Sequence, residues 1–457
     1  MTEQHFDLLI LGGGPAGTRA AFQAASAGMK TALVEACFLG GTCLNVGCIP
    51  TKYLLGGTAA LPLLAVQTKY KTARGSVAMD LEALQKRKER FVKGSRQALE
   101  KQLKEAGVSL FQGKGFFSGP QSVLVRQGGE NISLGFGKCI VATGSVPASF
   151  PGLAPDGKKV LSSAGLLNLS RVPERLLIVG GGAIGLELGE IFHRLGSKII
   201  MAEAMPRILP SEDEEVSKAA QAHFTREGWT LHTGRRIADL SSQEEGCLLR
   251  FEDGEELRAD CALVAVGRKP TSAALQPDAA GLAVGPRGWF ECNEELLCAE
   301  NIYAVGDANG RVLLAHAAEH QARYAVAHAS GADRGPYSPP AMPSCVYGSF
   351  EIMRVGPTLT ELQRLGGKMA VSSAPLAANA IAQSYGQPQG MVRMLWSDGV
   401  LRAVNAAGHG VSHLVGAASL LVSQNIQKNA ALPIIFAHPT LDEVLESAML
   451  APMENMP

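Results

Sequence analysis

The strongest constraint on the fold is a glycine pattern that occurs twice along the chain. Each copy has an apolar run, three glycines in G-x-G-x-x-G spacing, a helical stretch, a second apolar run and a glutamate. In the first copy these are 7–11, then Gly12, Gly14 and Gly17, then 31–34 and Glu35. In the second copy they are 176–179, then Gly180, Gly182 and Gly185, then 199–201 and Glu203. A strand, a glycine turn, a helix, a strand and an acid in this order form the dinucleotide-binding βαβ unit. The sequence therefore predicts an α/β protein with two Rossmann-like dinucleotide-binding domains.

The glycines and the glutamates have separate tasks in such a unit. The first glycine permits a tight turn, the second lets the backbone approach a pyrophosphate, and the third allows helix and strand to pack closely. Glu35 and Glu203 can each accept hydrogen bonds from an adenosine ribose, and a carboxylate at Glu203 would repel the extra phosphate of NADP. The second site should therefore prefer NAD, although Arg207 weakens the argument because an arginine can bind that phosphate. The alternatives are glycine turns that only pack helices on a sheet, and a solvated strand-end acid at Glu203.

Length and composition restrict the class of protein. A chain of 457 residues is expected to form about two to four domains with a large buried core. Lys and Arg together number 42, as do Asp and Glu, so no basic excess is available to bind a nucleic-acid backbone. The amino terminus enters a strand pattern without the features of an export signal, and no uninterrupted apolar run approaches membrane-spanning length. We therefore expect neither nucleic acid nor a membrane as a partner.

The cysteines divide into two groups. Seven of the nine are scattered singly and are expected to be reduced thiols in a cytoplasmic protein; they are Cys37, Cys139, Cys247, Cys261, Cys292, Cys298 and Cys345. Cys43 and Cys48 are the exceptions, because the segment GGTCLNVGCIPTK at 40–52 places them five positions apart. Residues so spaced in a regular helix lie about 8 to 9 Å apart between Cα atoms, beyond the reach of a disulfide. If the two pair, the turn must be distorted, and Gly47 would permit it.

Two alternatives remain open for Cys43 and Cys48 on spacing alone. They could be structural thiols, or they could be half of a zinc site. The second alternative is weakened because no second close pair of cysteines or histidines accompanies them at metal-binding spacing. We expect no bound metal.

Three segments resemble a known family. GGTCLNVGCIPTK closely resembles the redox-active disulfide motif of the flavoprotein disulfide reductases, and of dihydrolipoamide dehydrogenases in particular. VGDANG at 305–310, followed by LLAHAAEHQA at 313–322, resembles the second FAD motif of that family. AHPTLDE at 437–443 resembles its carboxyl-terminal histidine motif. The resemblance therefore covers essentially the whole chain.

The resemblance implies a division into four domains. They are an FAD-binding domain at 1–150, an NAD-binding domain at 151–272, a central domain completing the FAD site at 273–340, and an α+β interface domain at 341–457. The interface domain would form a homodimer whose active sites are shared between subunits. The partner would be a lipoylated carrier protein, either the acyltransferase of a 2-oxoacid complex or the glycine-cleavage carrier.

The resemblance also assigns catalytic roles. Cys43 would attack the substrate disulfide, and Cys48 would lie against the flavin. His438 of the partner subunit would be the acid/base, oriented by Glu443. A nearby base is required because a thiolate, and not a thiol, is the nucleophile in exchange. The alternative for His438 is a surface histidine that caps a helix.

Further residues match cofactor positions of the family. Lys52 and Glu187 match a pair near the reactive nitrogen of the flavin, where a cation would favour reduced, anionic flavin; both could instead be solvated charges. The motifs also carry positions expected to bind FAD, which are Gly12, Gly14, Gly17, Glu35, Thr143, Gly144, Gly306, Asp307 and Ala315, and positions expected to bind NAD, which are Gly180, Gly182, Gly185, Glu203 and Gly267.

Several residues depart from the family pattern. The chain reads YGSFE where many relatives have Thr-x-Pro-Glu, which leaves Gly348 and Phe350 unexplained. Phe436 would make the substrate mouth more apolar, and the small Ala183 suggests a more open nicotinamide pocket.

The activity implied is oxidation of protein-bound dihydrolipoyl groups with NAD through FAD and a Cys43/Cys48 disulfide. The alternatives are an NADH-dependent reductase of another disulfide or thiol carrier, and a non-catalytic flavin-binding paralogue. His409 and His413 are four positions apart and could share a helix face. Because they lack further metal partners, we interpret them as ordinary core or surface histidines.

Overall fold

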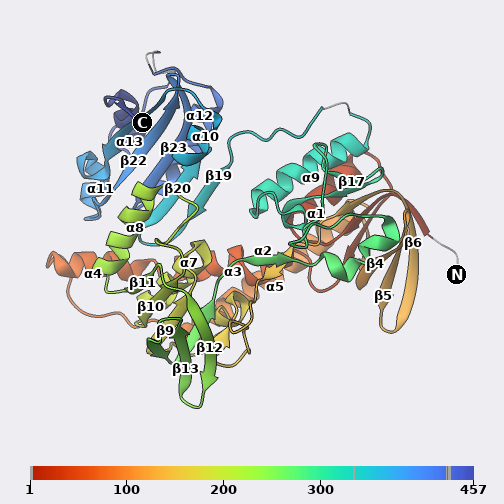
Figure 1. Cartoon of the computed structure of the whole chain (residues 1–457), viewed down its shortest axis with the longest axis horizontal. Helices are drawn as coiled ribbons and strands as arrows, with labels where there is room; N and C mark the ends of the chain where they lie inside the picture. The colour runs from red at the N-terminus through yellow and green to blue at the C-terminus, as the bar shows by residue number, and fades with distance from the viewer. Residues whose placement is uncertain (1–3, 333–334, 429, 431–433, 457) are drawn as a thin grey trace. The chain divides into compact units, whose positions relative to one another are not determined.

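The computed structural model describes residues 4–332, 335–428, 430 and 434–456 (Figure 1). The chain divides into two compact units, each made of three segments. Unit 1 contains Met1–Thr51, Lys86–Ala148 and Gly267–Pro339, and unit 2 contains Lys52–Gln85, Ser149–Val266 and Pro340–Pro457.

The sheet of unit 1 is centred on β1 (Gln4–Leu11), which pairs in parallel with β2 (Thr31–Glu35) and β6 (Glu130–Val141). All four residues of the apolar run 8–11 are buried, as expected for a strand covered on both faces. The strand order is β17-β18-β6-β1-β2-β3, and β5 links β6 to β4. The other strands are β3 (Ser109–Gln112), β4 (Lys114–Gly119), β5 (Ser122–Gln127), β17 (Leu297–Ala299) and β18 (Ile302–Ala304), with a separate pair formed by β7 (Ser145–Pro147) and β16 (Arg268–Pro270).

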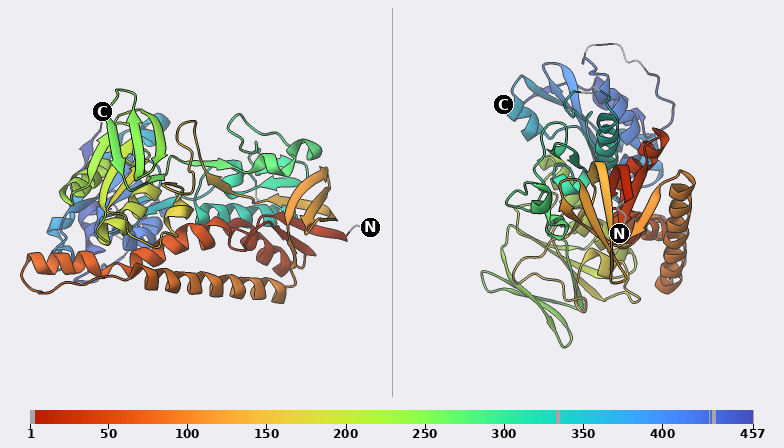
Figure 2. Two further views of the ribbon diagram at one scale, coloured as in Figure 1. Left: turned by 90° about the horizontal axis from the view of Figure 1, so that it is seen from below. Right: turned by 90° about the vertical axis from the view of Figure 1, so that its right-hand side faces the viewer.

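Two alanine-rich helices cover this sheet. Helix α1 (Pro15–Ser26) begins at a proline, whose fixed φ suits the first turn of a helix. It packs beside α9 (Ala315–Ala329), as Figure 1 shows, because small alanines on both helices allow the backbones to approach. The short helical elements of unit 1 are α2 (Gly41–Val46), η1 (Ser272–Leu275), η2 (Pro277–Ala280) and η3 (Gly306–Asn309). Helix α5 (Leu81–Glu105) is a single long helix, which is visible in Figure 2.

Unit 2 repeats the βαβ pattern. Strand β9 (Arg175–Val179), helix α7 (Ala183–Arg194) and strand β10 (Lys198–Glu203) follow one another, and the strands belong to a parallel sheet of order β11-β10-β9-β15-β8. Next to it in sequence is the antiparallel sheet β12-β13-β14. The other elements of this part are β8 (Val160–Leu161), α6 (Ser163–Leu166), α8 (Glu214–Arg226), β11 (Thr230–Thr233), β12 (Ile237–Gln243), β13 (Gly246–Phe251), β14 (Glu256–Ala259) and β15 (Cys261–Val264).

The carboxyl-terminal part of unit 2 is an antiparallel sheet of order β19-β20-β23-β22-β21-β24. Helices α12 (Val415–Ser423) and α13 (Glu443–Leu450) bury one side of each against it (Figure 1). The remaining elements are β19 (Pro343–Val346), β20 (Glu351–Val355), α10 (Leu359–Leu365), β21 (Met369–Pro375), η4 (Leu376–Ala378), α11 (Ala380–Ser384), β22 (Gly390–Ser397), β23 (Val400–Gly408), η5 (Val411–Leu414) and β24 (Glu454–Asn455).

A helical run at 41–69 differs from the sequence expectation about membranes. This run has 29 residues, and an 18-residue window within it has a mean hydropathy of 1.2, so it is long and apolar enough to cross a membrane by length and composition. It is interrupted, however, since α2 ends at Val46, α3 spans Cys48–Gly57 and α4 spans Ala60–Lys69. Leu54 and Leu55 are also buried in a core cluster of unit 2. We therefore interpret the run as part of the folded protein.

The α/β fold with two dinucleotide-binding βαβ units and a carboxyl-terminal α+β module confirms the expected class. The four domain boundaries at 1–150, 151–272, 273–340 and 341–457 stay predictions.

Candidate active site

The first glycine turn is too tight for side chains. Gly12 has a φ of +104°, and a Cβ atom there would lie 2.4 Å from the carbonyl oxygen of Ala142. A Cβ atom at Gly17 would lie 1.8 Å from the carbonyl oxygen of Gly12, so only glycine lets α1 start this close to β1. Gly14 is the N-cap of α1, and the amide groups of its first turn are available to an anion.

Glu35 is fixed at the end of β2 by two backbone amides. Gly13 N donates to Oε2 and Cys37 N donates to Oε1, each at 2.7 Å. A carboxylate oxygen can accept more than one hydrogen bond, so Glu35 retains acceptor capacity for a ribose hydroxyl. The turn and the acid lie side by side, as their spacing predicts.

The second glycine turn has the same geometry. Gly181 N donates to Glu203 Oε2, and Met205 N donates to Oε1, again at 2.7 Å each. Nη2 of Arg207 donates to the carbonyl oxygens of Pro210 and Glu212. Because these carbonyls hold the guanidinium, Arg207 is less available to bind the 2′-phosphate of NADP than the sequence alone suggests.

Other motif glycines and Ala315 lie at chain turns or helix starts. Gly180 has a φ of +109°, and Gly185 packs against its carbonyl oxygen. Gly182 is the N-cap of α7, and Ala315 is the first residue of α9. Gly144 and Gly267 have φ values of +68° and +113°.

A polar cluster surrounds Asp307 in unit 1. Ser145 Oγ donates to Asp307 Oδ2 at 2.5 Å, and Arg268 Nε donates to Ser145 Oγ at 2.6 Å. Gly306 N donates to Gln321 Oε1 at 2.7 Å. The sequence does not single out Arg268, Ser145 or Gln321, although Gln321 lies in the segment LLAHAAEHQA at 313–322.

The segment around Cys43 and Cys48 is not one regular helix. Cys43 belongs to α2, Cys48 begins α3, and Gly47 between them has φ −139° and ψ −115°. A Cβ atom at Gly47 would lie 2.9 Å from the carbonyl oxygen of Thr42. The distorted turn at Gly47 is thus confirmed.

Lys52 and Glu187 form an ion pair. Lys52 Nζ lies 2.5 Å from Glu187 Oε2, and Nζ also lies 4.5 Å from the ring centroid of Tyr347. Tyr347 N donates to Glu187 Oε1 at 3.1 Å. Burial raises the pKa of Glu187 even though Lys52 opposes the shift. The two are therefore not independent solvated charges, since the carboxylate is buried and depends on Lys52.

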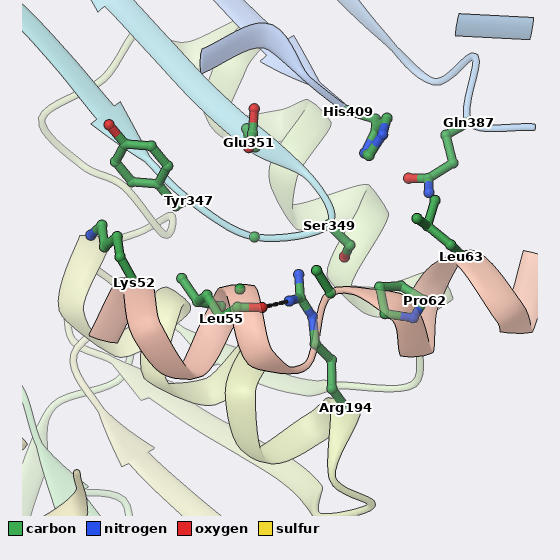
Figure 3. Close-up of a pocket in the computed structure, with 13 residues that line it drawn as sticks. Lys52, Leu55, Pro62, Leu63, Arg194, Tyr347, Ser349, Glu351, Gln387 and His409 are labelled. Carbon is green, nitrogen blue, oxygen red and sulfur yellow. Dashed lines mark hydrogen bonds between the residues drawn. The ribbon is translucent and has the colours of Figure 1, made fainter. Parts of the chain in front are cut away.

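A cavity of about 250 Å³ lies beside this ion pair (Figure 3). Lys52 and Tyr347 stand at one end, and Gln387 and His409 stand at the other. Arg194 closes one side, with Nη1 donating to the carbonyl oxygen of Leu55 at 3.0 Å. The cavity thus combines a cation with an apolar wall from α3 and α4.

His438 lies next to Glu443 at the start of α13. His438 Nδ1 is 2.8 Å from Glu443 Oε1, and Thr440 N donates to Glu443 Oε2 at 2.8 Å. The imidazole is 78% exposed, so its Nε2 atom can reach a second molecule. The hydrogen bond from Thr440 N and the one from His438 hold the pKa of Glu443 below its usual range. The N-cap of α13 is Asp442 and not His438, and the partner of the imidazole is the Glu443 side chain.

Comparisons with known proteins now decide the family. A sequence profile of the pyridine nucleotide-disulphide oxidoreductases matches residues 6–322, and the profile of their dimerisation domain matches residues 342–449. The chain belongs to this family. It is an FAD-dependent, NAD-linked disulfide oxidoreductase.

Individual members of the oxidoreductase family support this assignment. A dihydrolipoyl dehydrogenase of Chlorobaculum tepidum is 35% identical over 99% of this chain and 98% of its own length, and one of Bacillus subtilis is 33% identical over 97% and 98%. Among solved structures, the HOCl-induced flavoprotein disulfide reductase RclA of Escherichia coli, as a Cu(II) complex, has a TM-score of 0.87 at 25% identity, covering 98% of this chain and 99% of that chain. LpdA of Mycobacterium tuberculosis shares the fold, with a TM-score of 0.89 at 24% identity and the same coverage.

The residues of this oxidoreductase fit the cofactors of its family. Thr143 Oγ1 is buried and has no hydrogen-bond partner among the described residues, so a bound group could supply one. FAD would be held by the Gly12 turn, Glu35, Thr143 and Asp307. NAD would be held by the Gly180 turn and Glu203.

The structure accounts for one departure from the family pattern, the phenylalanine at 350. Phe350 is buried, and its ring stacks on His223 with centroids 4.5 Å apart and planes 17° from parallel. A Cβ atom at Gly348 would meet Glu190 Cγ at 3.4 Å, an ordinary contact, so no steric reason requires glycine there. Ala183 is exposed at the start of α7, and its effect on a nicotinamide pocket stays a prediction.

Phe436 is partly buried against the carboxyl-terminal core, and its effect on the substrate mouth stays a prediction. Two other sequence expectations need correction in the oxidoreductase. His409 follows β23 and His413 lies in η5, so they share no helix. A spacing of four positions would place both histidines on one face of a helix, but here the chain passes from a strand, β23, into a short 3-10 helix, η5.

The second correction concerns thiols that were expected to be single. Cys292 Sγ and Cys298 Sγ lie 2.8 Å apart. The turn at 293–297, with Leu296 at a φ of +64°, brings them together, which a count of cysteine spacings does not reveal.

Proposed function

We propose that the protein is a dihydrolipoyl dehydrogenase, which oxidises protein-bound dihydrolipoyl groups with NAD through FAD and a redox disulfide between Cys43 and Cys48. The observation that carries this proposal is the hydrogen bond between His438 Nδ1 and Glu443 Oε1. A dithiol substrate must lose a proton before it can open a disulfide, and this pair provides an exposed base for that step. Similarity to the dihydrolipoyl dehydrogenases of Chlorobaculum tepidum and Bacillus subtilis supports the choice of substrate.

The exchange steps follow from the positions of these groups. Glu443 binds Nδ1, so Nε2 of His438 accepts the proton of the substrate thiol. The substrate thiolate attacks Cys43 Sγ, and Cys48 leaves as a thiolate. The second substrate thiol then displaces Cys43, so the substrate becomes a cyclic disulfide and the cysteine pair holds two electrons. FAD, which would be held by the Gly12 turn, Glu35, Thr143 and Asp307, would supply the two-electron chemistry that links the cysteine pair to NAD.

We propose that Lys52 assists the electron transfer to the cofactor. A cation favours the negative charge of a reduced flavin, and Glu187 limits the cost of keeping that cation near a buried site.

We propose a homodimer in which His438 of the partner subunit completes each active site. The match to the family's dimerisation domain at 342–449 supports the dimer. Three large apolar side chains of this region, Leu365, Leu420 and Ile435, are strongly exposed, as is Leu450 directly after it. Apolar side chains of this size are commonly buried in homodimer interfaces.

Mixed subunits test the shared site. Cys43→Ser and His438→Gln chains are each expected to be inactive alone, because each lacks one half of every site. After random co-assembly about half of the dimers contain one of each chain, with one intact site of two, so about a quarter of wild-type activity should return. Light scattering checks the dimer itself. Complete absence of recovered activity in verified heterodimers contradicts a shared site.

Steady-state NAD reduction by dihydrolipoamide tests the activity. We expect fast turnover with dihydrolipoamide and NAD, with little activity for glutathione or NADP. The His438→Gln variant is the matched control, because it should retain flavin while losing exchange. Flavin that NADH reduces, without dihydrolipoamide turnover, would instead favour a reductase of another disulfide.

The carrier and the compartment are further proposals. The partner we propose is a lipoylated protein of a 2-oxoacid complex or of the glycine-cleavage system, and the compartment is the cytoplasm. Turnover with purified lipoylated carriers tests the first, and cell fractionation tests the second.

A further inference from the structure

A second cysteine pair lies outside the residues proposed for catalysis. Cys292 and Cys298 are both partly exposed, and their Sγ atoms lie 2.8 Å apart. A disulfide has an S–S distance of about 2.05 Å, so a movement of about 0.8 Å brings the two sulfurs to bonding distance. The pair is separated by five residues, which keeps the two thiols at high effective concentration.

The loop between the two cysteines is held by its own hydrogen bonds. Asn293 Oδ1 accepts from Glu295 N at 3.1 Å and from Leu297 N at 2.8 Å. Leu296 adopts a left-handed φ of +64°, which turns the chain back towards Cys292. The pairing of β17 with β18 is irregular between Leu297 and Ala299, where Cys298 lies. The proximity of the thiols therefore follows from an ordered turn.

A cation fixes the other side of the pair. Nη2 of Arg311 donates to the carbonyl oxygens of Cys292 at 3.1 Å and Asn293 at 2.6 Å. The hydrogen bond from Cys298, assisted by Arg311, lowers the pKa of the Cys292 thiol. The same hydrogen bond and burial raise the pKa of Cys298. Cys292 is thus the more readily ionised of the two thiols.

Two ordinary interpretations fit the pair less well. A metal site needs further ligands, and the part of the chain that the structure describes contains no group of three or more His, Cys, Asp or Glu residues that could hold a metal ion. Inert structural thiols are buried singly, as Cys139 is, and burial raises the pKa of that thiol. Unlike Cys139, Cys292 is partly exposed, lies against a second thiol and has a lowered pKa.

We infer that Cys292 and Cys298 form a second redox site, which a small disulfide such as glutathione disulfide oxidises to an intrachain disulfide. Cys292 attacks one sulfur of the small disulfide and releases one thiolate. Cys298 loses its proton, attacks Cys292 Sγ in the mixed disulfide and releases the second thiolate. The dithiol loses two electrons and two protons, and the small disulfide becomes two thiols.

Peptide mapping of the full-length flavoprotein tests this inference. Trypsin places both cysteines in one peptide, 288–311, whereas Cys43 and Cys48 fall in 31–52. The protein is reduced, exposed to glutathione disulfide, treated with an alkylating agent and digested. We expect peptide 288–311 to lose two hydrogens and take up no alkyl group, and dithiothreitol should reverse this. Peptide 288–311 with two alkylated cysteines, or with stable glutathione adducts on wild-type protein, overturns the inference.

Single variants separate the two thiols. In Cys298→Ser no resolving thiol remains, so a glutathione adduct should accumulate on Cys292. In Cys292→Ser the adduct on Cys298 should form about tenfold more slowly, because burial still raises the pKa of that thiol and leaves less thiolate. Both variants should keep their flavin absorbance, which verifies folding. Equal rates in the two variants, or a faster rate in Cys292→Ser, contradict the assigned roles.

Discussion

His438 Nδ1 lies 2.8 Å from Glu443 Oε1, and Thr440 N binds the other oxygen of the same carboxylate. The carboxylate therefore fixes the tautomer of the imidazole and leaves Nε2 for the substrate. This relationship forms within a segment of six residues, so it does not depend on how larger parts of the chain are placed.

The first prediction concerns Glu443→Gln. The amide keeps the size of the side chain but cannot support a positively charged imidazole, so kcat should fall about 10- to 100-fold. The low pKa of Glu443 keeps the carboxylate ionised at neutral pH. Since the pKa is lowered, the contribution of Glu443 is complete above its ordinary pKa and disappears only as the pH falls through the lowered value. The pH profile of kcat between about pH 6 and 9 should therefore show no step from Glu443 itself.

Glu446→Gln, one turn further along α13, is the control and should retain activity. Wild-type kcat in Glu443→Gln with an unchanged pH profile would remove Glu443 from the mechanism.

The second prediction concerns Lys52→Met. The change leaves the buried Glu187 carboxylate without its cation, so NADH should reduce the flavin about tenfold more slowly, a loss of about 1.4 kcal/mol in the barrier. Stopped-flow absorbance measures the rate, and flavin content should stay at the wild-type level.

Lys52→Arg retains the charge and should lose less than Lys52→Met. If the two variants reduce flavin at the wild-type rate, Lys52 has no part in electron transfer. A double variant with Glu187→Gln shows whether the defect comes from the unpaired carboxylate, because removing both charges should then restore part of the rate.

The sequence could predict those features of the site that form between residues close together along the chain. Glu35 and Glu203 bind amides only 22 residues earlier, and strand, turn and helix periodicity determines that spacing. The distorted turn at Gly47 was also predictable, because five positions between two cysteines are incompatible with a disulfide in a regular helix.

Contacts between distant segments could not be predicted in the same way. Ser145 reaches Asp307 across 162 residues, and Arg268 reaches Ser145 across 123. The Cys292/Cys298 pair was missed for a different reason, since it depends on the left-handed turn at Leu296. Leucine rarely adopts that conformation, so sequence propensity gives no signal for it.

The third prediction concerns the choice of pyridine nucleotide. Glu203→Ala should lower kcat/KM for NADH about tenfold and change it little for NADPH, because it removes both a ribose acceptor and a charge that repels phosphate. The ratio of the two kcat/KM values measures the preference. Arg207→Ala should leave this ratio within about twofold of wild type, since Pro210 and Glu212 carbonyls hold its guanidinium. A large change in Arg207→Ala would show instead that the arginine binds the nucleotide.

The fourth prediction concerns stability at acid pH. His223 stacks on Phe350, its Nε2 is buried with no partner among the described residues, and burial lowers its pKa to about 4. Glu190 opposes this shift, whereas Arg226 and His193 add to it. In the unfolded chain the imidazole has its ordinary pKa of about 6.5, so between pH 6.5 and 4 the unfolded state binds more protons than the folded state. The stabilising effect of neutral His223 is therefore complete above pH 6.5 and decreases as the pH falls.

At pH 5 the difference between the two pKa values of His223 lowers the free energy of unfolding by about 2 kcal/mol relative to neutral pH. His223→Phe keeps an aromatic ring against Phe350 but cannot take up a proton, so its denaturation midpoint should fall less than that of wild type between pH 7.5 and pH 5. Urea unfolding followed by tryptophan fluorescence and flavin fluorescence at both pH values measures the change. His316→Phe is the control at a histidine outside this stack, and its pH dependence should match wild type. If His223→Phe loses as much stability as wild type at pH 5, other groups cause the acid sensitivity, and the buried imidazole does not.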